Sequence, residues 1–155
     1  MSQLLNPCVN LKVLDMNLCG NMRSSELASL FTHNLQMCKS LEYLDICETP
    51  FSVHSMATAL MIMPELQYLD ISDTEADDEL LFVISNCNTN LKYISLTRCI
   101  NVSDAGIELL VEKCKQLETI SISDCPYIDN HAFIEEHNIR IEVEGEDGFE
   151  SLSDD

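Results

Sequence analysis

The stretch Leu41-Glu42-Tyr43-Leu44-Asp45-Ile46 returns 25 residues later as Leu66-Gln67-Tyr68-Leu69-Asp70-Ile71, and again as Leu91-Lys92-Tyr93-Ile94-Ser95-Leu96. Two further copies open at Leu11 and Leu117, so the five starts lie 30, 25, 25 and 26 residues apart. Apolar residues alternate within each copy, which is typical of a short strand with one buried face. Five matched copies at a near-constant spacing predict a repeat architecture.

A helical stretch follows each strand in this pattern. In the fourth unit Ser103 has the character of a helix N-cap, and Asp104 stands in the first turn, where negative charge is favoured. The second unit has no good cap, so we expect its helix to be shorter or less regular. A single strand–helix unit cannot bury its own apolar face, and neighbouring units must therefore stack. The expected fold is an α/β solenoid of five to six units over residues 1–144, with parallel strands on the concave side, helices on the convex side and a degenerate last strand at 139–143.

The amino-acid composition, above all the net charge, bears on which classes of partner the protein can bind. The 155 residues carry a formal net charge of −19, and residues 145–155 read as an acidic disordered tail. Because phosphate binding requires clustered Lys and Arg, we expect neither nucleic acid nor an anionic membrane as a partner. The sequence has no apolar run of about 18 residues and no basic-then-apolar N-terminal signal. The expected compartment is the cytoplasm, with the nucleus as the alternative.

The eight cysteines follow the repeat rather than a metal-binding spacing. No Cys-x-x-Cys occurs, and the four histidines do not cluster with cysteines, so we expect no metal and no cofactor. A buried free cysteine behaves as a small apolar residue, and most of these are expected in the interior. Cys47 is the exception, because its place in the repeat is on the exposed strand face. The others in register are Cys8, Cys38 and Cys114 before a repeat, and Cys19, Cys99 and Cys125 after a strand.

These residues carry a family resemblance. The pattern Cys114-x-x-Leu117-x-x-Ile120-x-Ile122-x-x-Cys125 resembles the cysteine-containing leucine-rich repeat, and the segment from Cys99 to Ile107 resembles its turn and helix. The repeat is typical of F-box/leucine-rich-repeat proteins and antagonist-of-mitotic-exit proteins. The resemblance, over about residues 8–143, implies a protein-binding horseshoe and substrate recognition for Skp–cullin–F-box ubiquitin ligases. Seven residues precede Cys8, too few for an F-box, so contact with Skp–cullin subunits is expected to be indirect.

Residues between the buried strand positions should point away from the core, because strand side chains alternate faces. Stacked units then align them in columns. The first column is Val13, Tyr43, Tyr68, Tyr93, Thr119 and Arg140; the second is Asp15, Asp45, Asp70, Ser95, Ser121 and Glu142; the third is Asn17, Cys47, Ser72, Thr97, Ser123 and Glu144. Within them, the candidate contact residues are Tyr43, Tyr68, Tyr93, Asp15, Asp45, Asp70, Asn17, Ser95 and Arg140.

The tyrosines and aspartates point to recognition of a basic protein segment. Tyrosine offers a large contact area with a polar tip, and a Lys or Arg could contact both columns through cation–π and ionic interactions. Aspartates on adjacent strands repel one another, and a purely structural reason for them is not obvious. The alternative interpretation is that Leu-Asp-Leu is simply a common form of the repeat and that tyrosine suits a solvated strand.

Signatures of catalysis are missing from the sequence. It has no glycine-rich phosphate loop, no Gly-x-Ser-x-Gly and no His-Glu-x-x-His. The acidic run from Asp73 to Glu79 is interpreted as a turn followed by the negatively charged start of a helix. We therefore expect a binding protein with no catalytic residues. The preferred function is substrate recognition in ubiquitin-ligase biology, and the alternative is a scaffold or assembly factor unconnected with ubiquitin that binds a basic partner.

Overall fold

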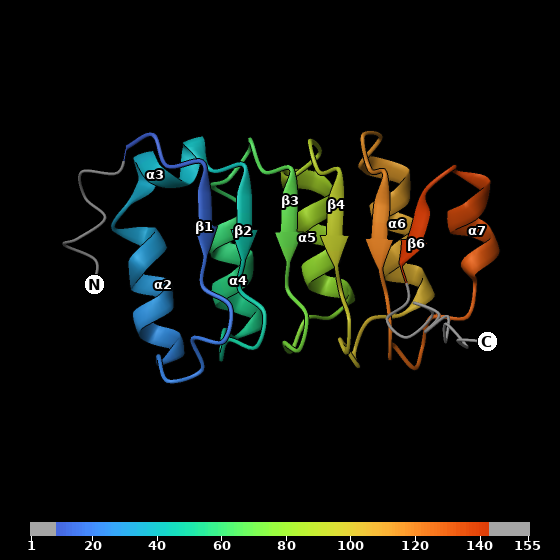
Figure 1. Cartoon of the computed structure of the whole chain (residues 1–155), viewed down its shortest axis with the longest axis horizontal. Helices are drawn as coiled ribbons and strands as arrows, with labels where there is room; N and C mark the ends of the chain where they lie inside the picture. The colour runs from blue at the N-terminus through green and yellow to red at the C-terminus, as the bar shows by residue number, and fades with distance from the viewer. Residues whose placement is uncertain (1–8, 143–155) are drawn as a thin grey trace, which may run out of the picture.

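Six short parallel strands stand side by side in one open sheet, and the helices of the middle units form a second layer behind them (Figure 1). The computed structural model describes residues 9–142. Cys8, Glu144 and the expected tail at 145–155 lie outside these residues. The strands are β1 (Val13–Asp15), β2 (Tyr43–Asp45), β3 (Tyr68–Asp70), β4 (Tyr93–Ser95), β5 (Thr119–Ser121) and β6 (Arg140–Glu142); the helices are α2 (Ser24–Thr32), α3 (Leu35–Ser40), α4 (Val53–Leu60), α5 (Asp78–Cys87), α6 (Asp104–Lys113) and α7 (His131–Glu136).

The strands pair strictly in chain order, from β1 to β6. Their register matches the sequence copies residue for residue, so that Tyr43 lies opposite Tyr68, and Tyr68 opposite Tyr93. Each unit crosses over through its helix and returns beside the previous strand, as a parallel ladder requires. The expected α/β solenoid of stacked units is confirmed.

The core consists of the repeated apolar positions. The first leucine of the second, third and fourth units is fully buried (Leu41, Leu66 and Leu91, 0% exposed). The corresponding Leu11 of the first unit is only partly buried, because no described unit packs on its outer side. Burial therefore accumulates between units, as in other solenoids, and is weakest at the N-terminal end.

The buried thiols occupy the places that the repeat predicted. Cys38, Cys99, Cys114 and Cys125 are all buried. The Cys99 thiol donates to the carbonyl of Ile71 in the preceding unit, at 3.2 Å. Thr74 stands at the equivalent position of the third unit, and its hydroxyl donates to that same carbonyl at 2.6 Å. The carbonyl of Ile71 thus accepts from a hydroxyl of its own unit and from a thiol of the next unit.

The helix starts differ from the sequence expectation in two units. Ser52 caps α4, since its side chain accepts from the backbone N–H of Ser55 at 3.4 Å, so the expectation of a missing cap was wrong. The helix is nevertheless shorter, with 8 residues against 10 in α5 and α6. Ser103 does lie at the N-cap of α6, but its side chain makes no capping hydrogen bond. Asp77 caps α5 by accepting from the N–H of Leu80 at 2.9 Å, as the acidic run predicted.

A left-handed residue recurs in each turn that follows a strand. It always stands four residues after the second apolar position of the unit, and none of these residues is glycine. These turns are called the strand-exit edge below. The residues and their φ angles are Leu18 (59°), Glu48 (53°), Asp73 (54°), Arg98 (58°) and Asp124 (55°).

Candidate binding face

Three tyrosines form a stack on the strand face, which is the side of the sheet turned away from the helices. The ring centroids of Tyr43 and Tyr68 are 4.1 Å apart, and those of Tyr68 and Tyr93 are 4.4 Å apart. The rings are nearly parallel, at 9° and 2°. All three residues are partly buried, because each ring covers the next. The stack is therefore a preformed surface that a partner need not order on binding.

Stacking changes how these rings can recognise a cation. Both faces of Tyr68 are occupied by Tyr43 and Tyr93, so a Lys or Arg cannot lie over that ring as cation–π contact requires. Ring edges and hydroxyls are what Tyr68 offers instead. Burial raises the pKa of Tyr68, and the neighbouring Tyr93 raises it further. The phenol stays protonated at neutral pH and can donate a hydrogen bond.

Each aspartate of the second column closes the turn after its strand. The carboxylate of Asp15 accepts from the N–H of Asn17 at 3.0 Å, and Asp45 accepts from Cys47 at 2.9 Å. The carboxylate of Asp70 accepts from the N–H of Ser72 at 2.9 Å. The column therefore has a structural role, which was not obvious from the sequence, because an Asx turn satisfies a backbone donor at the end of each of these strands.

The three aspartates differ in how much they expose. Asp15 is exposed and Asp70 is partly buried, whereas Asp45 is only 7% exposed. Burial raises the pKa of Asp45, and the carboxylates of Asp70 and Asp15 raise it further against the hydrogen bond from Cys47. Asp15 and Asp70 are therefore better placed to contact a positively charged group of a partner. Asp45 contributes mainly through long-range electrostatic attraction.

Hydroxyl side chains continue the second and third columns beyond the aspartates. The hydroxyls of Ser72 and Ser95 are 2.7 Å apart, and those of Thr97 and Ser121 are 2.9 Å apart. Ser95 is only 4% exposed, so the expectation of an exposed contact residue at this position was wrong. Its hydroxyl is held inside the face by its neighbours. The electrostatic character of the strand face therefore changes from acidic at β1–β3 to neutral at β4–β5.

The remaining sequence candidates lie at the ends of the columns. Asn17 is exposed beside the first strand. Arg140 is exposed on β6 in the tyrosine column, where its guanidinium pairs with Glu142. The structure brings Tyr43, Tyr68 and Tyr93 together, and it places Arg140 two strands away from the nearest of them.

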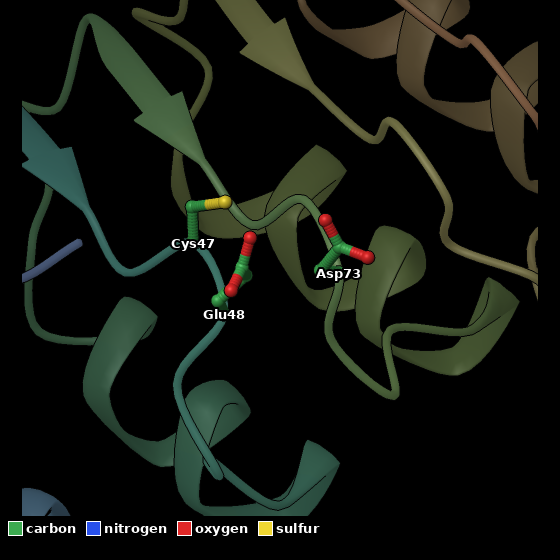
Figure 2. Close-up of side chains that lie close together, drawn as sticks. All are labelled: Cys47, Glu48 and Asp73. Carbon is green, nitrogen blue, oxygen red and sulfur yellow. The ribbon is translucent and has the colours of Figure 1, made fainter. Parts of the chain in front are cut away.

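A corner of three potential metal ligands lies where the strand face meets the strand-exit edge. Figure 2 shows Cys47, Glu48 and Asp73, whose ligand atoms lie within 4.8 Å of one another. Burial raises the pKa of Cys47 to about 12, with further contributions from carboxylates including Asp70 and Asp45. Asp73 is already paired with Arg98, whose Nε lies 2.8 Å from both carboxylate oxygens. To use these ligands, a metal ion would have to displace the proton of Cys47 and compete with Arg98 for Asp73.

Three residues of this surface, Glu48, Asp73 and Arg98, were not among the candidates predicted from the sequence. Their signal was present, because they occupy equivalent positions in consecutive units, one residue past the third column. The alternation of side chains that predicts the three columns holds only within the extended segment. The left-handed turn carries them one position further.

Comparison with known proteins supports the repeat assignment. No known protein-family profile matches the chain. A curated relative, F-box/LRR-repeat protein 4 from Bos taurus, is 32% identical over 126 residues, which cover 79% of this chain. The chain belongs to the leucine-rich-repeat proteins. This leucine-rich-repeat chain spans only 20% of the length of the bovine protein.

A solved structure supports the same fold. The leucine-rich-repeat chain superposes on the crystal structure of a TLR13–ssRNA13 complex with a TM-score of 0.57 and 15% identity, over 86% of this chain and 18% of the other. At this identity the likeness shows the fold alone. Together the two comparisons support a leucine-rich-repeat module. Within residues 9–142, no helix is long and apolar enough to cross a membrane.

Proposed function

We propose that this leucine-rich-repeat chain binds a protein partner through its strand face and that the partner presents a basic segment. The observation that carries the proposal is the tyrosine stack of Tyr43, Tyr68 and Tyr93 lying beside the column of Asp15, Asp45 and Asp70. Aromatic residues dominate binding hot spots, and the adjacent carboxylates favour positively charged partners. The proposal is one of binding, with no catalytic step.

The test is truncation of the central tyrosine. Tyr68→Ala should weaken binding of a captured partner about thirtyfold, as loss of an interface hot spot does. The matched control is Tyr127→Ala, since Tyr127 is 64% exposed and lies outside the tyrosine column. Unaltered affinity in a Tyr43→Ala/Tyr68→Ala/Tyr93→Ala protein that remains folded would place the binding site on another surface.

The contribution of charge to binding is measured separately, from the association rate and its dependence on salt. Changing Asp15, Asp45 and Asp70 to asparagine should lower the association rate and flatten its dependence on salt, because exposed charges steer encounter over a Debye length of about 8 Å at physiological salt. By the same reasoning we expect no measurable affinity for single-stranded RNA or for vesicles of anionic lipid, given the net charge of −19. Fluorescence anisotropy with a labelled oligonucleotide and vesicle sedimentation measure these two expectations.

For the biological role, we propose substrate recognition linked to Skp–cullin–F-box ubiquitin ligases. The support is the likeness to a relative named F-box/LRR-repeat protein 4. The alternative is a scaffold or assembly factor that uses the same face without ubiquitin. Affinity purification with mass spectrometry separates them: Skp and cullin subunits recovered with the wild-type chain favour the first, whereas a stable complex without them, whose other members are not ubiquitinated, favours the second.

A further inference from the structure

A groove opens on the strand-exit edge, next to the strand face. It has a volume of about 750 Å³ and is lined by residues from the segments 49–53, 73–77 and 98–101, which belong to three consecutive units. A volume of this size is typical of pockets that hold a ligand group. We call it the edge groove.

The edge groove is lined by both polar and apolar side chains. Among the apolar ones, Phe51 is buried, at 1% exposed, whereas Ile100 is 59% exposed. Pro50 is exposed as well, and Val53 is partly buried. An isoleucine this exposed is ordinary on its own, but here it borders a hollow that already contains buried aromatic and aliphatic surface.

Two of the acidic groups in the groove already have partners. The carboxylate of Asp73 is held by Arg98, and that of Asp77 accepts from the backbone N–H of Leu80. Because these carboxylates are held by hydrogen bonds within the protein, they attract nearby positive charge but are not free to bind a partner directly. Beside these groups, Pro50, Val53 and Ile100 supply the apolar part of the lining, and exposed Glu75 adds negative charge.

A second hollow adjoins the edge groove. It has a volume of about 580 Å³ and shares Thr49, Pro50, Asp73 and Arg98 with the edge groove. It also includes Glu48, which stands beside Cys47 of the third column in the corner shown in Figure 2. The tyrosine column and the strand-exit edge are separated by five residues in each unit, a span of at most about 18 Å. One extended segment of a partner can therefore reach both.

We propose that the edge groove takes an apolar side chain from the same basic partner segment that lies on the tyrosine stack. This inference rests on the proposed function and adds to it: the segment pairs basic residues, over Asp15 and Asp70, with an apolar residue a few positions away. Charge complementarity favours a basic segment, and the edge groove determines the position of the apolar residue within that segment. A purely basic segment would leave the groove empty and bind more weakly.

The experiment selects peptides on the full-length chain. A displayed library of random 12-residue peptides is enriched on the wild-type protein, and the enriched sequences are synthesised with a fluorescent label for anisotropy. The expected sequences combine two or more Lys or Arg with one apolar residue within about five positions. Replacing that apolar residue by serine should weaken binding about tenfold, the loss of one buried aliphatic contact.

Two matched protein variants locate the contact. Ile100→Ser should weaken the same peptides about tenfold and should abolish the effect of the serine replacement in the peptide. Phe82→Ser is the control, because Phe82 is 56% exposed on α5, outside the residues that line the groove. It should change the affinity less than twofold. Circular dichroism and urea unfolding of each variant verify that the fold is retained.

The outcomes separate this inference from the proposed function. If Tyr68→Ala weakens the peptides and Ile100→Ser matches Phe82→Ser, the strand face binds and the groove assignment is wrong. If Tyr68→Ala and Ile100→Ser both leave affinity unchanged, or if no peptide is enriched, both proposals fall. Enriched peptides without a conserved apolar position would also overturn the assignment of the groove.

Discussion

The carboxylate of Asp78 accepts two hydrogen bonds from Ser103 in the next unit, one from the backbone N–H at 2.8 Å and one from the hydroxyl at 2.6 Å. Asp104 repeats this arrangement one unit later, because it accepts from the N–H groups of Asp129 and Asn130. The first residue of each of these helices therefore fastens the start of the following one. Gly106 lies against this contact, and a Cβ there would stand 2.3 Å from Oδ1 of Asp78.

Gly106→Ala should destabilise the protein, although alanine is normally favoured over glycine inside a helix by about 1 kcal/mol. The added methyl group meets both Asp78 and, at 3.0 Å, Leu81. Overpacking of this kind costs about 1–3 kcal/mol. Urea unfolding measures the loss. The control is the same substitution in an Asp78→Ala background, where the cost should shrink, and a more stable Gly106→Ala protein would contradict the packing described.

Asp45 should be replaceable by asparagine but not by alanine. An amide oxygen can still accept from the N–H of Cys47 and removes repulsion from Asp15 and Asp70, so Asp45→Asn should match or exceed wild-type stability at pH 7, by up to about 1 kcal/mol. Asp45→Ala should lose about 1 kcal/mol, because the backbone donor loses its partner.

The pH dependence of the Asp45→Asn comparison has a definite sign. The folded-state pKa of Asp45 is raised, so its contribution to stability is fully present below the unfolded value and is lost as pH rises through the folded value. The advantage of Asp45→Asn over the wild type should therefore shrink from pH 7 to pH 4. An advantage that grows on acidification would mean that Asp45 is stabilised as a carboxylate.

Cys47 should react slowly with a maleimide at neutral pH, despite its place on the strand face. Burial and the surrounding carboxylates raise its pKa to about 12, so only about one thiol in ten thousand is thiolate at pH 8. The exposed position that the repeat predicts for Cys47 would by itself favour fast labelling, and the raised pKa opposes it. Its rate should climb with pH toward 12 and should rise in Asp70→Asn. Peptide mapping by mass spectrometry follows each thiol separately, with the urea-unfolded chain as the reference.

The first unit should be the least protected from hydrogen exchange. Leu11 and Leu14 are only partly buried, and Val9, Val13 and Leu18 are exposed. Unpacked apolar surface lowers local stability. Amides of β1 should exchange faster than those of β4 in a monomeric sample, while a sample at high concentration should show protection of β1 if chains associate through this end. Equal protection of β1 and β4 at low concentration would count against the difference in burial.

The periodicity of the sequence was sufficient to predict the strands, their register and the alignment of Tyr43, Tyr68 and Tyr93, because side chains alternate with a period of two. Ring stacking was not predictable, since it depends on side-chain rotamers that pattern alone does not determine. The role of the aspartates depends on the turn beyond the strand, where the next N–H groups point back at the carboxylate. Ser52 could have been predicted as an N-cap, because serine is favoured at this position, but the apolar pattern of the helix drew attention away from it.

Length variation explains another difference between expectation and structure. The first unit is 30 residues long, and its additional residues form a separate short helix, α3, after α2. Pattern alone predicted one helical stretch per unit. The stacking of strands is unaffected, because the insertion lies in the crossover and leaves β1 and β2 in register.

The left-handed residues on the strand-exit edge keep one backbone conformation from unit to unit, whereas their side chains differ. The backbone there is imposed by the turn, because the φ angles agree within a few degrees although the side chains are apolar, acidic or basic; the residues are Leu18, Glu48, Asp73, Arg98 and Asp124. Glycine would relieve the steric cost at these places. Because these positions carry side chains, they form a row of residues beside the edge groove that can be substituted one at a time. Each substitution can change the affinity of this rim for a given partner while the solenoid keeps its fold.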